Sequence, residues 1–406
     1  MLAALKSKVM HTLAAASARP IDVVAHERLR LRILFGVAIL KLFNFIGGVW
    51  DIQWHVAIGR DSLFIPPHLL VIFAFVAGLA LVLAMIFKET AMAISGQSIP
   101  HAARLGPFFA PPAFFGVFYG YTAALLSGGF DELWHDIFGI DATLWSPPHL
   151  MIMLATMVVD FSLLLGVTAS SRRLGYKFTW NSPLFWGVVL IGAYAFEAVN
   201  FQMGEAFIVG YRHGGVGLYG LLFPLLVGAF LPLSMLTCIR LARRFWVVLL
   251  IFAVTMLLQY LATGIAAAGF AILKPVSVID EYVRLNPEST AAKAREFAAL
   301  LGFHGLIGFH QAWTMSLSAL PLVLVSLLEF FPWARRRPLL AAPLFAVSMV
   351  LFSFLWFEQT PALRGYPITG LHLLQAALIS ALVGLITGSL GLRLARNVSL
   401  FGAVSG

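Results

Sequence analysis

Long apolar runs separated by short polar segments recur along the chain from residue 31 to residue 395. A helix that crosses a bilayer needs an apolar run of about 20 residues, and runs of this length predict ten transmembrane helices. The predicted spans lie near residues 31–50, 67–87, 107–127, 148–168, 184–203, 214–238, 245–272, 303–331, 339–357 and 370–392. The expected fold class is an all-α integral membrane protein.

Composition strengthens this prediction and excludes several other classes. Hydrophobic residues make up 60% of the chain and charged residues 11%, whereas a soluble domain carries about 25% charged residues. The single Cys238 excludes a disulfide scaffold. The formal net charge of +9 is interpreted as a record of orientation and of contact with anionic lipid. We therefore expect the lipid bilayer, and no nucleic acid, as a partner.

The distribution of basic residues predicts the orientation. With ten spans, both termini and the even-numbered loops share one side, and nineteen of the 27 Lys and Arg residues fall there, against seven on the opposite side. Positive residues gather on the cytoplasmic side of membrane proteins. The termini are therefore predicted to be cytoplasmic, in a bacterial inner (plasma) membrane, with the odd-numbered loops facing the periplasm.

Three regions follow from these patterns. Residues 1–28 are expected to form a basic amphipathic segment on the cytoplasmic face. Residues 29–170 hold a duplicated hairpin, and residues 171–406 form a six-helix transmembrane region with an outer loop near 274–302. Turn and capping residues at 286–289 precede an alanine-rich run, which predicts a short surface helix in that loop.

The duplicated hairpin is visible as an internal repeat. Residues 51–68 read DIQWHVAIGRDSLFIPPH and residues 131–149 read DELWHDIFGIDATLWSPPH. The positions Asp51, Trp54, His55, Gly59 and Asp61 recur 80 residues later as Asp131, Trp134, His135, Gly139 and Asp141, and a Pro-Pro-His sequence closes both copies. Because each copy joins two spans, the first four helices are predicted to form two related hairpins.

The spacing within each repeat brings polar side chains together. Asp51 and His55 are one helical turn apart on the same face. Two prolines suit the start of a helix, so His68 falls in the first turn of the second span. A hairpin returns that turn to the depth it left, so Asp51, His55 and His68 converge near the outer leaflet. In the second repeat the same argument applies to Asp131, His135 and His149.

Two histidines and a carboxylate form a donor set that suits Cu, Zn, Fe or Ni. Asp61 and Asp141 are candidates for carboxylates that hold an imidazole N–H beside such a metal. A structural alternative is that the Asp–His pairs cap helix ends while Trp54 and Trp134 lie in the aromatic belt of the membrane.

The first repeat resembles the metal-binding segment of the C subunit of copper-dependent membrane monooxygenases, the particulate methane and ammonia monooxygenases. The resemblance covers roughly residues 30–170 and matches that family's motif at Asp51, His55, Arg60, Asp61 and His68. The family's second site is similar to Asp131, His135 and His149, with asparagine where Asp131 stands. The resemblance implies copper as the cofactor, with zinc or iron as alternatives, and O2-dependent hydroxylation of a small apolar substrate or ammonia. It also implies a homo-oligomer or additional membrane subunits.

Polar residues also lie where lipid makes them costly. Asp160 follows His149 by eleven residues, about three helical turns along nearly the same face. Lys41, ten residues before Asp51, lies at a comparable depth and is its candidate partner, while Glu197 belongs to the fifth span. Such residues usually pair, line water or relay protons. We interpret the three either as a structural tie or as a proton path.

The leading hypothesis is therefore a membrane monooxygenase with duplicated outward-facing metal sites. A rival hypothesis is a transporter or metal-delivery protein that loads an ion at the outer face and carries it past Asp160, Lys41 and Glu197. A third is a non-catalytic subunit in which the metal is structural.

Overall fold

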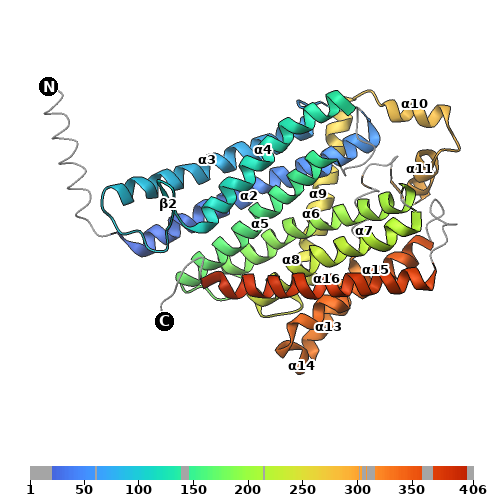
Figure 1. Ribbon diagram of the computed structural model, residues 1–406. Coiled ribbons are helices and arrows are strands. Elements are labelled where there is room, and N and C mark those ends of the chain that lie inside the picture. The colour runs from blue at the N-terminus through green and yellow to red at the C-terminus, as the bar shows by residue number, and fades with distance from the viewer. Residues whose placement is uncertain are drawn as a thin grey trace, which may run out of the picture.

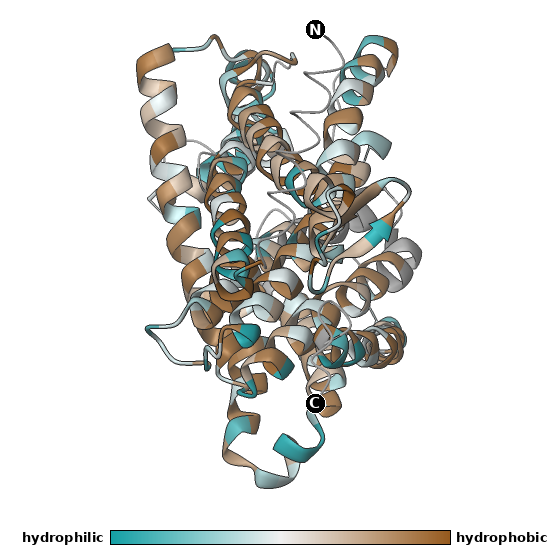
Figure 2. Ribbon diagram, turned by 90° about the vertical axis from the view of Figure 1, so that its left-hand side faces the viewer, coloured by the Kyte–Doolittle hydropathy of each residue, from teal (hydrophilic) through white to brown (hydrophobic). Residues whose placement is uncertain are grey.

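A computed structural model describes residues 21–59, 62–138, 146–213, 215–300, 302, 303, 308, 316–358 and 369–399. Eight helices within these residues are long and apolar enough to cross a membrane. Two shorter apolar helices, Pro183–Val199 and Ala319–Phe330, fall at the fifth and eighth predicted spans. The chain is thus an all-α, multi-pass membrane protein, and Figure 2 shows its long helices coloured mainly as hydrophobic. The number of ten crossings stays a prediction.

The helices that carry the two repeats come first in the chain. They are α2 (Val23–Ala57), α3 (Pro66–Ile94), α4 (Pro112–Phe138) and α5 (Pro147–Arg173). A small hairpin of β1 (Ala103–Leu105) and β2 (Phe108–Ala110) lies between α3 and α4 and pairs Arg104 with Phe109. The helix α2 begins at Val23, so residues 23–28 extend the first long helix.

The second part of the chain supplies the remaining helices. They are α6 (Pro183–His213), α7 (Gly215–Ala229), α8 (Leu231–Ala242), α9 (Val247–Leu273), α10 (Val278–Leu285), α11 (Thr290–Leu300), α13 (Ala319–Leu327), α14 (Pro332–Arg336), α15 (Ala341–Glu358) and α16 (Gly370–Arg396). Three short 3-10 turns, Leu328–Phe330, Pro338–Leu340 and Asn397–Ser399, complete the described elements.

The first four long helices pack in sequential pairs. Most contacts of α2 are with α3 and most contacts of α4 are with α5, while α3 packs on α4 and α2 on α5 (Figure 1). The helix α6 packs on α5 and is followed by α7 and α8. The helix α16 packs on α7 and α8, and α15 packs on α16. The helix α9 bridges both parts by packing on α2 and on α6. Whether the two pairs arose by duplication stays a prediction.

The last helix, α16, shows why the sequence packs in this way. Its inner face carries the small buried residues Ser380, Gly384, Gly388 and Gly391, and small residues let membrane helices approach closely. A Cβ added at Gly391 would come 2.4 Å from the backbone oxygen of Leu233 in α8. The opposite face carries exposed leucines at three- or four-residue spacing, such as positions 374, 378 and 382. This face is suited to lipid.

The loop after α9 forms two helices, α10 and α11. The predicted surface helix is present as α11, where the Ser289 side chain accepts a hydrogen bond from the backbone of Ala292. The preceding helix α10 was not predicted. It docks on the end of α2, because the Ser277 hydroxyl donates to the carbonyl of Ala57 and the Val278 N–H donates to the carbonyl of Ile58. Residues from the second part of the chain therefore contact the end of α2 in the first repeat.

Candidate metal centre

The first repeat places its three predicted ligands at the end of α2 and the start of α3. Asp51 and His55 lie in the last two turns of α2, and α3 begins at Pro66, so His68 is its third residue. The carboxylate oxygen Oδ1 of Asp51 lies 3.1 Å from His68 Nε2 and 3.7 Å from His55 Nδ1. The connecting chain turns at Gly59, whose φ of 71° suits glycine. The predicted convergence is thus present in this repeat.

The second repeat places its ligands in the same way on α4 and α5. The helix α5 begins at Pro147, which makes His149 its third residue. Asp131 Oδ2 lies 3.6 Å from His135 Nε2, and Asp131 Oδ1 lies 3.6 Å from His149 Nδ1. The Ser146 hydroxyl lies 2.7 Å from the same His149 nitrogen and fixes the ring. Asp61, Asp141 and Arg60 lie outside the described residues.

The two sets of ligands meet. The ring centroid of His149 is 6.3 Å from that of His55, in the other repeat, and 6.2 Å from that of His135 in its own. Within the first repeat, His55 and His68 are 6.5 Å apart. We call the six residues the histidine–carboxylate cluster; they are Asp51, His55, His68, Asp131, His135 and His149. Their side chains are 9–15% exposed, so bulk water has little access to them.

Hydrogen bonds to the backbone define the charge state that the first repeat requires. A carbonyl can only accept, so His68 Nδ1, 2.9 Å from the carbonyl of Ser62, carries the proton. The lone pair of Nε2 then faces the Asp51 carboxylate across 3.1 Å. Two electron-rich atoms at this distance need a cation between or beside them, either a second proton on the imidazole or a metal ion. Metal-ligating histidines typically donate their other N–H to a carbonyl in this way.

The side chains do not yet form a closed coordination shell. Among the described residues, no group of three or more His, Cys, Asp or Glu side chains is arranged to hold a metal ion. Donor atoms that share a metal at about 2.0–2.2 Å in tetrahedral geometry lie about 3.3–3.6 Å apart. Of the contacts in the cluster, 3.1 Å lies below this range, 3.6 Å at its upper edge and 3.7 Å above it. Small side-chain rotations are therefore required before the cluster can chelate an ion.

A mainly apolar cavity of about 330 Å³ adjoins the cluster. Its walls come from α2, α3, α4 and α5 and include aliphatic and aromatic side chains such as Val71, Ile72, Phe75 and Leu125. Asp51, His68, Asp131 and His149 lie at its polar end. The arrangement can place a small apolar molecule beside four of the six residues.

A second, smaller cavity of about 150 Å³ extends from the cluster along α2, α5 and α6. Asp51 and His149 line one end, and Lys41 and Glu197 line the rest with Tyr194. The expected contact of Lys41 with Asp160 is present, with Nζ 2.9 Å from Oδ1, and both side chains are almost fully buried. Of the three intramembrane residues singled out in the sequence, Lys41 and Glu197 therefore line this cavity, and Asp160 contacts Lys41.

One of the two tryptophans differs from the structural alternative. Trp54 is 7% exposed and stacks on Phe270 of α9, with ring centroids 5.7 Å apart, so it packs inward. Trp134 contacts Phe138 in its own helix at 4.3 Å. Trp54 thus ties the end of α2 to α9 and does not extend into a membrane belt.

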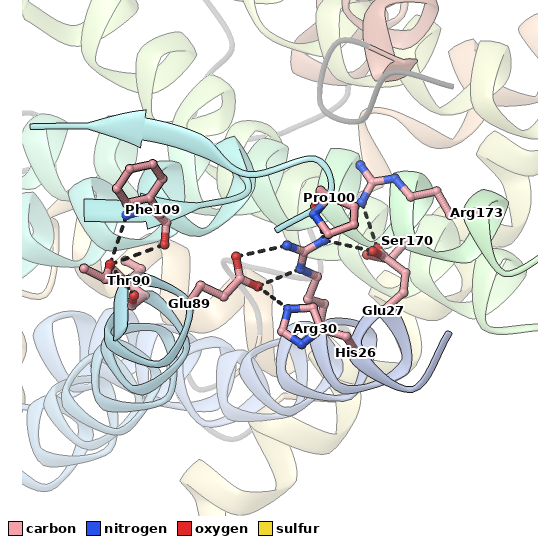
Figure 3. Close-up of polar contacts among 10 residues, drawn as sticks. His26, Glu27, Arg30, Glu89, Thr90, Pro100, Phe109, Ser170 and Arg173 are labelled. Carbon is pink, nitrogen blue, oxygen red and sulfur yellow. Dashed lines mark hydrogen bonds and ion pairs between the residues drawn. The ribbon is translucent and has the colours of Figure 1, made fainter. Parts of the chain in front are cut away.

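A buried charge network at the other end of α2 was missed in the sequence (Figure 3). Arg30 donates to both carboxylate oxygens of Glu89 in α3, at 2.7 and 2.9 Å, and to Glu27 at 3.0 Å. Glu27 also accepts hydrogen bonds from Ser170 and Arg173 of α5. The network joins three helices, and its sequence signal was the presence of a carboxylate, Glu89, near the end of a mainly apolar helix.

Comparison of the chain with protein families, with curated proteins and with solved structures finds no match.

Proposed function

We propose that the chain is a membrane metalloprotein in which the histidine–carboxylate cluster binds copper and supports O2-dependent hydroxylation of a small apolar substrate or ammonia. The observation that carries the proposal is the meeting of both repeats in one water-restricted cluster beside a mainly apolar cavity of about 330 Å³. The resemblance of the first repeat to copper membrane monooxygenases gives the reaction class. We further propose a bacterial inner membrane, with the cluster toward the periplasm, and additional subunits or copies as partners.

The donor set supports a transition metal. The four imidazoles favour copper, zinc or iron over the hard cations Mg²⁺ and Ca²⁺, and Cu²⁺ binds such sites most tightly among the divalent first-row metals. The residues that would hold it are Asp51, His55, His68, Asp131, His135 and His149. When bound, copper would supply the binding and reductive activation of O2.

The protein's own residues prepare the site. The Ser62 carbonyl fixes the His68 ring, and the Ser146 hydroxyl fixes the His149 ring, so two of the four imidazoles are oriented in advance. The apolar walls of the larger cavity exclude water and favour substrates without charge. Phe75 and Val71 close this cavity on the side of α3.

One contact bears on the transporter hypothesis. A metal ion that left the cluster along the smaller cavity would meet Lys41, whose ammonium group is held 2.9 Å from Asp160. The two opposite charges offset each other, so this ion pair does not by itself repel a cation. Metal-dependent ion flux in vesicles that Asp160→Asn abolishes would support transport.

Metal analysis of protein purified in lipid nanodiscs tests the proposal. We expect wild-type protein to retain copper and both His55→Ala and His135→Ala to lose it, because His149 lies beside His55 and His135. His372→Ala is the matched control, since His372 caps α16 outside the cluster. Equal copper in all four proteins would contradict the proposal.

Activity separates the enzyme from a metal-stabilised subunit. Copper-loaded protein with a reductant and a small apolar substrate should consume O2 and release the hydroxylated product, and His55→Ala should abolish both. Copper binding without O2 consumption, combined with loss of thermal stability on copper removal, would identify the metal as structural.

A further inference from the structure

The smaller cavity follows one face of each of three helices. Its lining residues on α2 are at positions 41, 44, 45, 48, 51 and 52, which is the spacing of a single helical face. From α5 it takes positions 149, 152, 153 and 156, and Asp160 continues the same face one turn further. With a rise of about 1.5 Å per residue, the ten residues between Lys41 and Asp51 separate the two ends of the cavity by about 15 Å.

Polar side chains are spaced along the length of the cavity, between walls that are mainly apolar. Asn44 and Thr156 lie between the cluster and the residues at the inner end. A volume of about 150 Å³ has room for several water molecules, because one molecule needs on the order of 10–15 Å³ of this kind of space. Polar groups spaced along such a space can form a hydrogen-bonded chain with water.

Glu197 and Asp160 differ in their partners among the described residues. Asp160 is paired with Lys41, whereas Glu197 forms no ion pair or hydrogen bond within the part of the chain that the structure describes. It is half-buried and interacts electrostatically with Lys41 and Asp160. Carboxylates at membrane depth that line a cavity typically take part in proton relays.

We propose that Glu197 carries protons through the smaller cavity to and from the histidine–carboxylate cluster. When Glu197 gives up its proton, its O–H bond breaks and the proton passes along the cavity toward the cluster. The charge of the carboxylate that remains is partly offset by the Lys41 ammonium group, which it shares with Asp160, until a proton taken up from water in the cavity restores the O–H bond. The charged and titratable groups around it are Lys41 and Asp51 of α2, His149 and Asp160 of α5, and Tyr194 of α6; α9 adds no charged residue.

This role deepens the proposed function, because O2 reduction at the cluster consumes protons while the substrate arrives without charge. The two cavities share Asn44, Gly48, Asp51, His149 and Ile152. Protons and apolar substrate can therefore reach the cluster by separate routes that join there.

Gly48 offers a means to close the route. A Cβ at this position would meet nothing within 4 Å, so a side chain can begin there without displacing its neighbours. Gly48→Leu would fill the junction of the cavities with an apolar group. Gly48→Ala is the matched control, because it adds the helix-stabilising methyl group and leaves most of the space open.

Infrared spectroscopy of metal-free protein in nanodiscs tests the proposal independently of the metal. We expect a C=O stretching band of a protonated carboxyl group that Glu197→Gln removes and Glu329→Gln retains. On transfer to 2H2O the band should exchange rapidly in wild type and in Gly48→Ala. Gly48→Leu should slow the exchange by roughly tenfold or more.

Two results would overturn the inference. If the band persists in Glu197→Gln, another group holds the proton. If Gly48→Leu exchanges as fast as Gly48→Ala, the proton does not travel through this cavity. Neither result depends on copper. A protein that exchanges as expected and binds no metal would therefore contradict the proposed function but not the role of Glu197.

Discussion

The imidazole rings of His55 and His149, which come from different repeats, lie with their centroids 6.3 Å apart and their planes at 83°. Asp51 interacts electrostatically with both rings. The two repeats therefore do not build two distant sites. Their ligands form one cluster, so a substitution in one repeat should also affect the ligands of the other.

Removal of the hydroxyl group beside His149 should weaken metal binding without removing a ligand. Ser146→Ala deletes the 2.7 Å contact to His149 Nδ1, and loss of such an orienting group typically weakens metal affinity by about 10- to 100-fold. Competition with a copper chelator measures the change. Ser348→Ala, which deletes only a bond to the backbone of its own helix α15, should bind copper like wild type. Unchanged affinity in Ser146→Ala would show that the ring needs no such support.

The buried charge network should contribute strongly to stability. Glu89→Ala leaves the guanidinium of Arg30, which is 1% exposed, without its main partner, and breaking a buried pair costs about 3–5 kcal/mol. Arg244→Ala is the control, because Arg244 is half exposed where it contacts Glu329 and such pairs contribute about 0–1 kcal/mol. Thermal unfolding in detergent can be followed with a thiol-reactive dye, since the lone Cys238 is buried. Similar melting temperatures for the two variants would contradict this role.

Gly59 should tolerate no side chain. Its φ of 71° is a left-handed conformation, which costs a residue with a Cβ about 1–2 kcal/mol, and that Cβ would also come 2.8 Å from Val278 and Ile279 of α10. Gly96→Ala isolates the backbone term, because Gly96 has a φ of 84° and open space around it. We expect Gly59→Ala to be the more destabilising and to increase proteolysis near α10. Equal effects would show that α10 adapts without cost.

Acidification should destabilise the protein partly through His101, which lies in the segment between α3 and β1. Burial, reinforced by the nearby Arg173, lowers the pKa of His101 below its usual 6.5. The folded protein therefore favours the neutral ring, so this contribution is present above pH 6.5 and is lost as the pH falls through the lowered pKa. His101→Asn suits the φ of 63° and should reduce the drop in melting temperature between about pH 7.5 and 5.5. An unchanged drop would assign the effect to other groups.

The local features of the site could be predicted because they depend on short-range rules. The prolines at 66 and 147 start α3 and α5 as expected, and the i, i+4 spacing of Asp51 and His55 places both near His68. A charged residue in an apolar helix needs a partner, which predicted the contact of Lys41 with Asp160. The first two of these inferences use only a helix and the turn that follows it, and the third uses the cost of leaving a buried charge without a partner.

The remaining features depend on how helices pack across the chain. The approach of His55 to His149 requires α2 to pack on α5 with these two residues side by side. Nothing in the sequence predicts that alignment of the two helices. Glu89 could be recognised as costly, yet its partner Arg30 was assigned by position to a polar segment before the first span. The helix α10 was missed although its sequence carries a local signal, since the Ser277 side chain caps it by accepting a hydrogen bond from the Asp280 N–H.

The docking of α10 on the loop of the first repeat has a consequence for the order of synthesis. All six residues of the cluster have been made once the ribosome passes His149, but α10 ends at Leu285. For the synthesis of more than a hundred further residues, the ligands exist without the segment that later lies against Ile58 and Gly59. An ion delivered during membrane insertion would therefore meet the six ligands while the end of α2, two residues beyond His55, still lacks its contact with the segment that begins α10.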